Sequence, residues 1–147
     1  MTDFEALLRT LDRNRVAYII VGGAAALAHG SVRFTQDLAV VYSRSSGNLD
    51  RLVAALQDLK PYLRGAPPGL PFVWSRATLL HGLNFTLQTS LGLIDLLGET
   101  PGGGTYEDLV NSCVELRLFE GVSKCIFDRR PADFSPVQLE HAGTYIL

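Results

Sequence analysis

Residues 35–41 read TQDLAVV, a polar start that runs into an apolar segment. The apolar run predicts a buried β-strand over residues 37–43, with Asp37 at its start. Side chains alternate between the two faces of a strand, so Asp37 and Ala39 share one face and lie roughly 7 Å apart. A carboxylate on an apolar face is costly unless something pairs with it. The strand therefore raises two questions: what Asp37 pairs with, and why its neighbour on that face is only a methyl group.

The segments around this strand predict an α/β (α+β) fold, with helices packed on a mixed sheet of four to six strands. Thr2 and Glu5 have the spacing of a capping box, and Ser90 marks a hairpin between two adjacent strands. Residues 60–71, rich in Pro and Gly, are expected to form a loop. The expected helices cover residues 2–14, 22–30, 48–59, 75–82 and 105–112, and the other expected strands cover 16–21, 83–89, 91–97, 114–120 and 122–127.

The composition is that of one globular domain. The chain has 147 residues, of which 47% are hydrophobic and 19% charged, enough to build a core of its own. We place the domain at residues 1–127, and the tail over 128–147 has no clear period. The net charge of −2 argues against sequence-independent grip on a nucleic-acid backbone.

Two features bear on location. The first fourteen residues lack the basic start and apolar stretch of a secretion signal, and no apolar run in the sequence is long enough to span a bilayer. Cys113 and Cys125 lack metal-site spacing, so we expect two reduced thiols. The chain is therefore expected in the cytoplasm, without a membrane partner.

Three features suggest a site. Gly22 and Gly23 stand between a strand and a helix, where a backbone without side chains and the helix N-terminus suit a phosphate. Asp37 opens the next strand. Asp95 lies between Ile94 and Leu96 in a later apolar strand. Two acids near a phosphate-binding turn suit Mg²⁺, which prefers carboxylates together with substrate phosphates. The implied chemistry is phosphoryl or nucleotidyl transfer.

The stretch VGGAAALAHGSVRFTQDLAVV (21–41) resembles the nucleotidyltransferase superfamily that includes DNA polymerase beta. The likeness is greatest to small bacterial nucleotidyltransferase-like proteins, including those of toxin–antitoxin and abortive-infection systems, and it covers roughly residues 4–127. It implies Mg²⁺-dependent transfer of a nucleoside monophosphate from an NTP to RNA such as tRNA, to protein or to a small molecule, and an antitoxin as a possible partner. The nucleotide-binding residues would be Gly22, Gly23, Arg33 and Thr35, and the catalytic, metal-binding acids Asp37 and Asp95.

The sequence departs from the family pattern in two places. The second acid should stand at position 39, where this chain has Ala39, and the end of the chain lacks the expected basic helix. Either the chain is a natural pseudoenzyme or Ala39 is an inactivating substitution. We expect transfer to be lost or weakened. The alternative is a catalytically silent module that binds a nucleotide or a protein. Glu99 is a candidate to replace the missing acid.

Each candidate residue also has an ordinary structural interpretation. The two glycines can serve a tight turn, Asp37 a strand edge and Asp95 a structural hydrogen bond, which would leave a purely structural domain. His29 is expected to cap or pack, and residues 106–108 to start a helix. The remaining candidates are arginines that either meet phosphates or lie in solvent, a turn threonine, and histidines without convincing partners: Arg33, Arg44, Thr35, His81 and His141.

Overall fold

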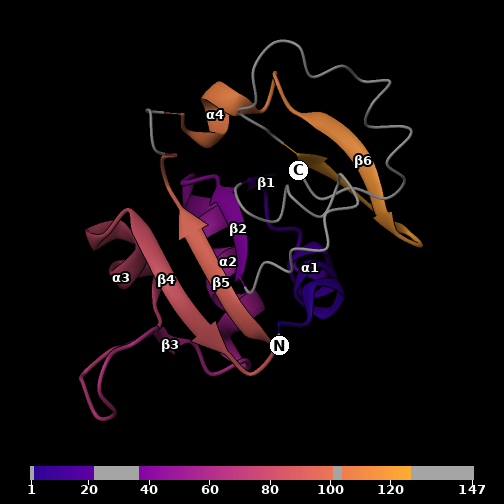
Figure 1. Ribbon diagram of the computed structural model, residues 1–147. Coiled ribbons are helices and arrows are strands. Elements are labelled where there is room, and N and C mark those ends of the chain that lie inside the picture. Colours follow the sequence, from indigo (N-terminus) through magenta and orange to yellow (C-terminus); the bar gives the residue numbers. More distant parts are fainter. Residues whose placement is uncertain (1, 22–36, 101–103, 127–147) are drawn as a thin grey trace.

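The computed structural model describes residues 2–21, 37–100 and 104–126 of the chain (Figure 1). Within these ranges, seven strands form one sheet in the order β3-β4-β5-β2-β1-β7-β6. The β3–β4 pair and the β6–β7 hairpin lie at opposite ends of it (Figure 1). The elements are α1 (Phe4–Arg13), β1 (Tyr18–Val21), β2 (Asp37–Tyr42), α2 (Ser46–Gln57), β3 (Tyr62–Leu63), α3 (Arg76–His81), β4 (Asn84–Thr89), β5 (Gly92–Leu97), α4 (Tyr106–Leu109), β6 (Val114–Phe119) and β7 (Val122–Ile126).

The sheet is mixed, as the sequence predicts. β2 pairs in parallel with β5 and antiparallel with β1, while β1 pairs in parallel with β7. The expected hairpin around Ser90 is confirmed, because β4 and β5 pair antiparallel on either side of it. The sheet has one strand more than expected, since Tyr62 and Leu63 pair with β4 inside the segment that was predicted to be a loop. The expected helix over residues 22–30 and the tail over 128–147 lie outside the described residues.

The main core lies between the sheet and the helices α1 and α2. Leu7, Leu8 and Leu11 of α1 are fully buried, as are Leu49, Leu52 and Leu56 of α2. They pack against alternate residues of the central strands, namely Ile20, Leu38, Val40, Ile94 and Leu96. This spacing of two along the strands directs those side chains to one face of the sheet. None of the helices in the described ranges is long and apolar enough to cross a membrane.

A second, smaller apolar cluster uses the alternate residues of the same strands. It joins Ile19, Val21, Ala39 and Val41 with Leu109 of α4. The members from β1 and β2 alternate with those of the main core, so this cluster lies on the opposite face of the sheet. Asp37 is two residues before Ala39 and therefore belongs to this second face.

The start of α1 differs from the prediction. Asp3, not Thr2, is the N-cap, and its carboxylate accepts from the backbone N–H of Ala6 at 3.0 Å. Thr2 lies instead against the β4–β5 turn, where its hydroxyl accepts from the N–H of Leu93 at 3.0 Å. Gly92 has a φ of +121°, and a Cβ there would meet the Cα of Thr2 at 2.4 Å. The capping-box prediction is wrong because the N-terminal segment is fixed by this turn rather than by the helix.

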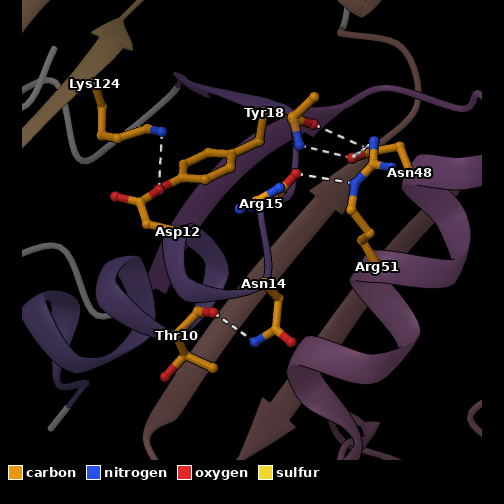
Figure 2. A network of polar contacts seen from close by, with 9 residues as sticks. Thr10, Asp12, Asn14, Arg15, Tyr18, Asn48, Arg51 and Lys124 are labelled. Carbon is orange, nitrogen blue, oxygen red and sulfur yellow. Dashed lines mark hydrogen bonds and ion pairs between the residues drawn. The ribbon is translucent and has the colours of Figure 1, made fainter.

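Asn48 of α2 forms hydrogen bonds with the residues that flank β1 and β2 (Figure 2). Its side chain is fully buried. The amide oxygen accepts from the N–H of Ala17 at 2.6 Å, and the amide nitrogen donates to the carbonyls of Ala17 at 3.1 Å and Ser43 at 2.7 Å. Arg51, one turn further along, donates to the carbonyl of Arg15 at 3.0 Å. An amide suits this place because it is both donor and acceptor. It thereby satisfies backbone groups beside the start of β1 and the end of β2.

A second polar contact joins α1 to β7 (Figure 2). The carboxylate of Asp12 accepts from the hydroxyl of Tyr18 at 3.0 Å and lies 2.9 Å from the ammonium of Lys124. That ammonium is also 4.3 Å from the centroid of the Tyr18 ring. Burial, followed by the nearby Asp12 charge, raises the pKa of Tyr18 above its ordinary value. The tyrosine therefore stays protonated and keeps donating to Asp12.

Cys113 and Cys125 form a disulfide, with their Cα atoms 5.5 Å apart. The expectation of two reduced thiols is therefore wrong. The pairing of β6 with β7 places Cys125 opposite Glu115, two residues after Cys113, so the hairpin brings the two sulfurs together. Disulfides persist in oxidising surroundings. The cytoplasmic location accordingly stays a prediction, and the cysteines no longer support it.

We expect the Asn48→Ala variant to lose stability on the order of 3 kcal/mol, because each buried backbone group left without a partner costs about 1–3 kcal/mol. Urea unfolding followed by circular dichroism measures the loss. Asn111→Ala is the matched control, since Asn111 is exposed, and it should stay within about 0.5 kcal/mol of the wild type. Equal effects of the two substitutions would contradict the role of Asn48.

The disulfide predicts that iodoacetamide labels neither cysteine of the native chain and labels both after reduction, as read by mass spectrometry. Reduction should lower the free energy of unfolding by about 2–3 kcal/mol, as expected for a closed loop of this size. In the Cys113→Ser variant, Cys125 should be labelled without reductant. The free energy of unfolding of this variant should not change when reductant is added. Labelling of both native cysteines before reduction would disprove the bond.

Candidate functional site

The two candidate acids lie on neighbouring strands and on one face. β2 and β5 pair in parallel, with Asp37 opposite Leu93, Leu38 opposite Ile94 and Ala39 opposite Asp95. The expectation that the strands of Asp37 and Asp95 lie side by side is thus confirmed. Their expected closeness to the Gly22–Gly23 turn falls outside the described residues. Neighbouring strands are about 5 Å apart, so the methyl group of Ala39 stands directly beside the Asp95 side chain.

The guanidinium of Arg64 contacts both acids. Its Nη2 lies 2.8 Å from Oδ1 of Asp95, and its Nη1 lies 3.7 Å from Oδ2 of Asp37. The exposed fractions of the side chains are 27% for Arg64, 18% for Asp95 and 37% for Asp37. All three charges are therefore partly withdrawn from water, where ionic attraction is stronger than at an open surface.

Arg64 reaches the acids from the edge of the sheet. It follows β3 directly, and its backbone N–H donates to the carbonyl of Thr86 on β4 at 3.0 Å. Its side chain then runs over β4 and β5 toward β2, and Nη2 donates to the carbonyl of Leu87 at 3.0 Å. Thr86 is opposite Asp95 in the β4–β5 register. The two extra backbone contacts hold Arg64 at the height of Asp95 along the sheet.

The contact between Arg64 and Asp95 is mainly an ion pair, since the charge of Arg64 lowers the pKa of Asp95 more than its hydrogen bond does. Oδ1 of Asp95 and Nε of Arg64 are buried and have no hydrogen-bond partner among the described residues, although Nη2 is only 2.8 Å from that oxygen. Nη2 also donates one of its two N–H groups to the carbonyl of Leu87. The pairing is thus mainly electrostatic and leaves polar capacity unused.

Burial raises the pKa of Asp95 from its ordinary value of 3.8 to about 6. A hydrogen bond with Asp37 and the charge of that carboxylate raise the pKa further, while the charge of Arg64 lowers it. Two carboxyl groups in contact share a proton more readily than either would alone. Near neutral pH the two acids and Arg64 together therefore carry about one net negative charge.

These residues do not fit the Mg²⁺ site that the resemblance implies. A metal ion of this kind takes several oxygen ligands and usually more than one carboxylate. Here Ala39 supplies a methyl group beside Asp95, and the guanidinium of Arg64 already contacts both acids. Within the described ranges, no group of three His, Cys, Asp or Glu side chains is arranged to hold a metal. Whether Glu99 replaces the missing acid stays a prediction for metal titration. Its backbone forms an isolated β-bridge with Thr105.

The other candidates divide into those the structure describes and those it does not. Arg44 is not at the acids, because it follows the far end of β2 and donates to the hydroxyl of Tyr42 at 2.6 Å. His81 ends α3 and is exposed. The helix start around Tyr106 is confirmed, since Thr105 and Asp108 form a capping box there. Outside the described residues are Gly22, Gly23, His29, Arg33, Thr35 and His141.

Arg64 is the site residue that sequence reasoning missed. It stands 27 residues after Asp37 and 31 before Asp95, inside a stretch rich in Pro and Gly. One signal was present, since Tyr62 and Leu63 form a short apolar pair just before it, and a strand there would have fixed the direction of the next side chain. No local pattern links this arginine to the two acids.

No protein-family model matches the chain, and no curated protein matches it.

The raised pKa of Asp95 predicts a pH dependence of stability. The folded state holds the Asp95 proton more tightly than the unfolded state does. The protonated carboxyl therefore adds to the free energy of unfolding in full below about pH 4, and this stabilisation is lost as the pH rises through about 6. A shift of this size corresponds to at most about 3 kcal/mol. Water that reaches the site screens the charges, so we expect about 1–2 kcal/mol.

Urea unfolding of the wild type and of the Asp95→Asn variant from pH 4 to pH 8 measures this effect. The stability of the wild type relative to the variant should fall across that range, because the amide does not titrate. Asp50→Asn serves as the control, since Asp50 is an exposed partner of Arg76. A difference between wild type and Asp95→Asn that stays constant with pH would show that Asp95 titrates normally.

Proposed function

We propose that this chain is a nucleotidyltransferase-like domain that binds a nucleotide and, with Ala39, transfers it weakly or not at all. The observation that carries the proposal is the register of β2 and β5. It puts Asp37, Ala39 and Asp95 on one face, with the methyl group of Ala39 beside Asp95. That arrangement supports an acid site of this superfamily in which Ala39 stands in place of one of three carboxylates.

The resemblance assigns the nucleotide to the same region. Gly22 and Gly23 would receive the triphosphate, and Arg33 and Thr35 would lie beside it. When bound at such sites, Mg²⁺ neutralises the charge of the triphosphate. In this chain the acids are already balanced in part by Arg64, which leaves less negative charge to hold a metal ion. Binding of a nucleotide without transfer is therefore the form of the function that this chain favours.

The active and the silent forms of the proposal also differ in whether they require a second molecule besides the nucleotide. Transfer would require an acceptor such as RNA, with tRNA as one candidate, a protein or a small molecule. An antitoxin partner belongs to the same active form of the proposal. A silent nucleotide binder needs neither an acceptor nor an antitoxin, whereas a silent protein binder needs a partner protein. An experiment that restores the missing carboxylate separates the two forms.

We expect the Ala39→Asp variant to gain transfer on the order of a hundredfold, because electrostatic stabilisation at an intact site contributes several kcal/mol. The measurement is transfer of label from α-³²P NTPs to total RNA and to protein in the presence of Mg²⁺. Ala39 is buried and beside Asp95, so the new carboxylate should lower stability without Mg²⁺. Added Mg²⁺ should then stabilise the variant more than the wild type.

Two controls separate charge from shape. Ala39→Asn has nearly the size of the aspartate without its charge, and it should give neither transfer nor Mg²⁺-dependent stabilisation. Adding Asp95→Asn to Ala39→Asp should remove the gain. Calorimetric titration of the wild type with each NTP then tests binding alone. The proposal is lost if the wild type binds no NTP and Ala39→Asp shows neither label transfer nor stabilisation by Mg²⁺.

A further inference from the structure

We infer that Arg64 is an internal counter-cation, which competes with a divalent metal ion for Asp37 and Asp95. This inference deepens the proposed function, since it concerns the same acids. It rests on contacts that are independent of the nucleotide. Among the described residues, Arg64 is the cation that contacts both carboxylates, at 2.8 Å from Asp95 and 3.7 Å from Asp37.

The position of Arg64 argues for this role over that of an ordinary surface ion pair. The pairs Arg9–Glu5 and Arg76–Asp50 each join one acid to one arginine, and their side chains are 43–58% exposed. Arg64 instead meets acids from two different strands, and its side chain is only 27% exposed. A pair of this kind gains more from attraction and is screened less by water.

The chemistry of the guanidinium makes the competition direct. Arginine stays charged at any ordinary pH, and its planar fork presents two nitrogens to two acids at once. A metal ion bound to the same oxygens would lie within a few ångströms of this fixed positive charge. The repulsion between the two cations would weaken metal binding strongly. The metal can enter only if the guanidinium moves away or is removed.

The hydrogen bonds of Arg64 indicate what holds it in place. Its backbone N–H and its Nη2 donate to carbonyls on β4. These bonds fix both the backbone of Arg64 and its guanidinium. Its Nε is buried and has no partner among the described residues. A side chain that accepts this cost is better explained by the attraction of two carboxylates than by backbone bonding alone.

The test is Mn²⁺ binding without nucleotide, measured by electron paramagnetic resonance of the free ion at pH 7.5. Arg64→Gln removes the charge and keeps an amide donor, and it should bind one Mn²⁺ at least about tenfold more tightly than the wild type. Arg64→Lys keeps the charge and should stay close to the wild type. Arg76→Gln, which removes an arginine from an exposed ion pair elsewhere, should change nothing.

Further variants keep the outcome clear. Asp95→Asn added to Arg64→Gln should remove the gain, which ties the ion to the acid pair. If Arg64→Gln does not fold by circular dichroism, Arg64→Met carries the same test, because it keeps the apolar stem without the charge. The inference is overturned if a folded, uncharged variant binds Mn²⁺ no better than the wild type, or if Arg64→Lys gains as much as Arg64→Gln. Because no NTP is used, the proposed nucleotide binding can fail while this result stands, and the reverse also holds.

Discussion

The parallel pairing of β2 with β5 is the constraint on which the candidate site depends. It aligns Asp37, Ala39 and Asp95 on one face, and it aligns Leu38 with Ile94 on the other. Leu38 and Ile94 are fully buried under α1 and α2. A slip of one residue would turn Asp95 into that core and an apolar side chain out of it. The burial of the core thus fixes the position of the acids.

The balance of charge between the two acids and Arg64 decides whether this face of the sheet can hold a metal ion. Two carboxylates within reach of one another repel, and burial raises the pKa of Asp95 to about 6. A fixed guanidinium offsets part of that repulsion without supplying the higher charge or the coordination of a metal ion. Ala39 removes a further acid from the same place. The face therefore carries about one net negative charge near neutral pH, although it holds two acids.

Several elements follow from local patterns, and others do not. The apolar alternation and the turn around Ser90 predict the β4–β5 hairpin correctly, since neighbours along the chain decide such contacts. The strand at Tyr62 and Leu63 is not predicted from the sequence. Two residues are too few to show a periodic pattern, and they form a strand only by pairing with β4. The N-cap of α1 is Asp3 rather than the predicted Thr2, because the hydroxyl of Thr2 accepts a hydrogen bond from the N–H of Leu93, far along the chain.

The sequence by itself determined that Asp37 and Ala39 share a face, that Asp95 interrupts an apolar strand and that the chain combines helices with strands. These properties depend on periods of two and of three to four residues, which are local. The tertiary structure decided which strands are neighbours, that Cys113 bonds to Cys125, and that Arg64 reaches both acids. Such contacts join segments far apart in the chain. Their energy depends on where the packed sheet brings the side chains, and spacing along the sequence does not record that.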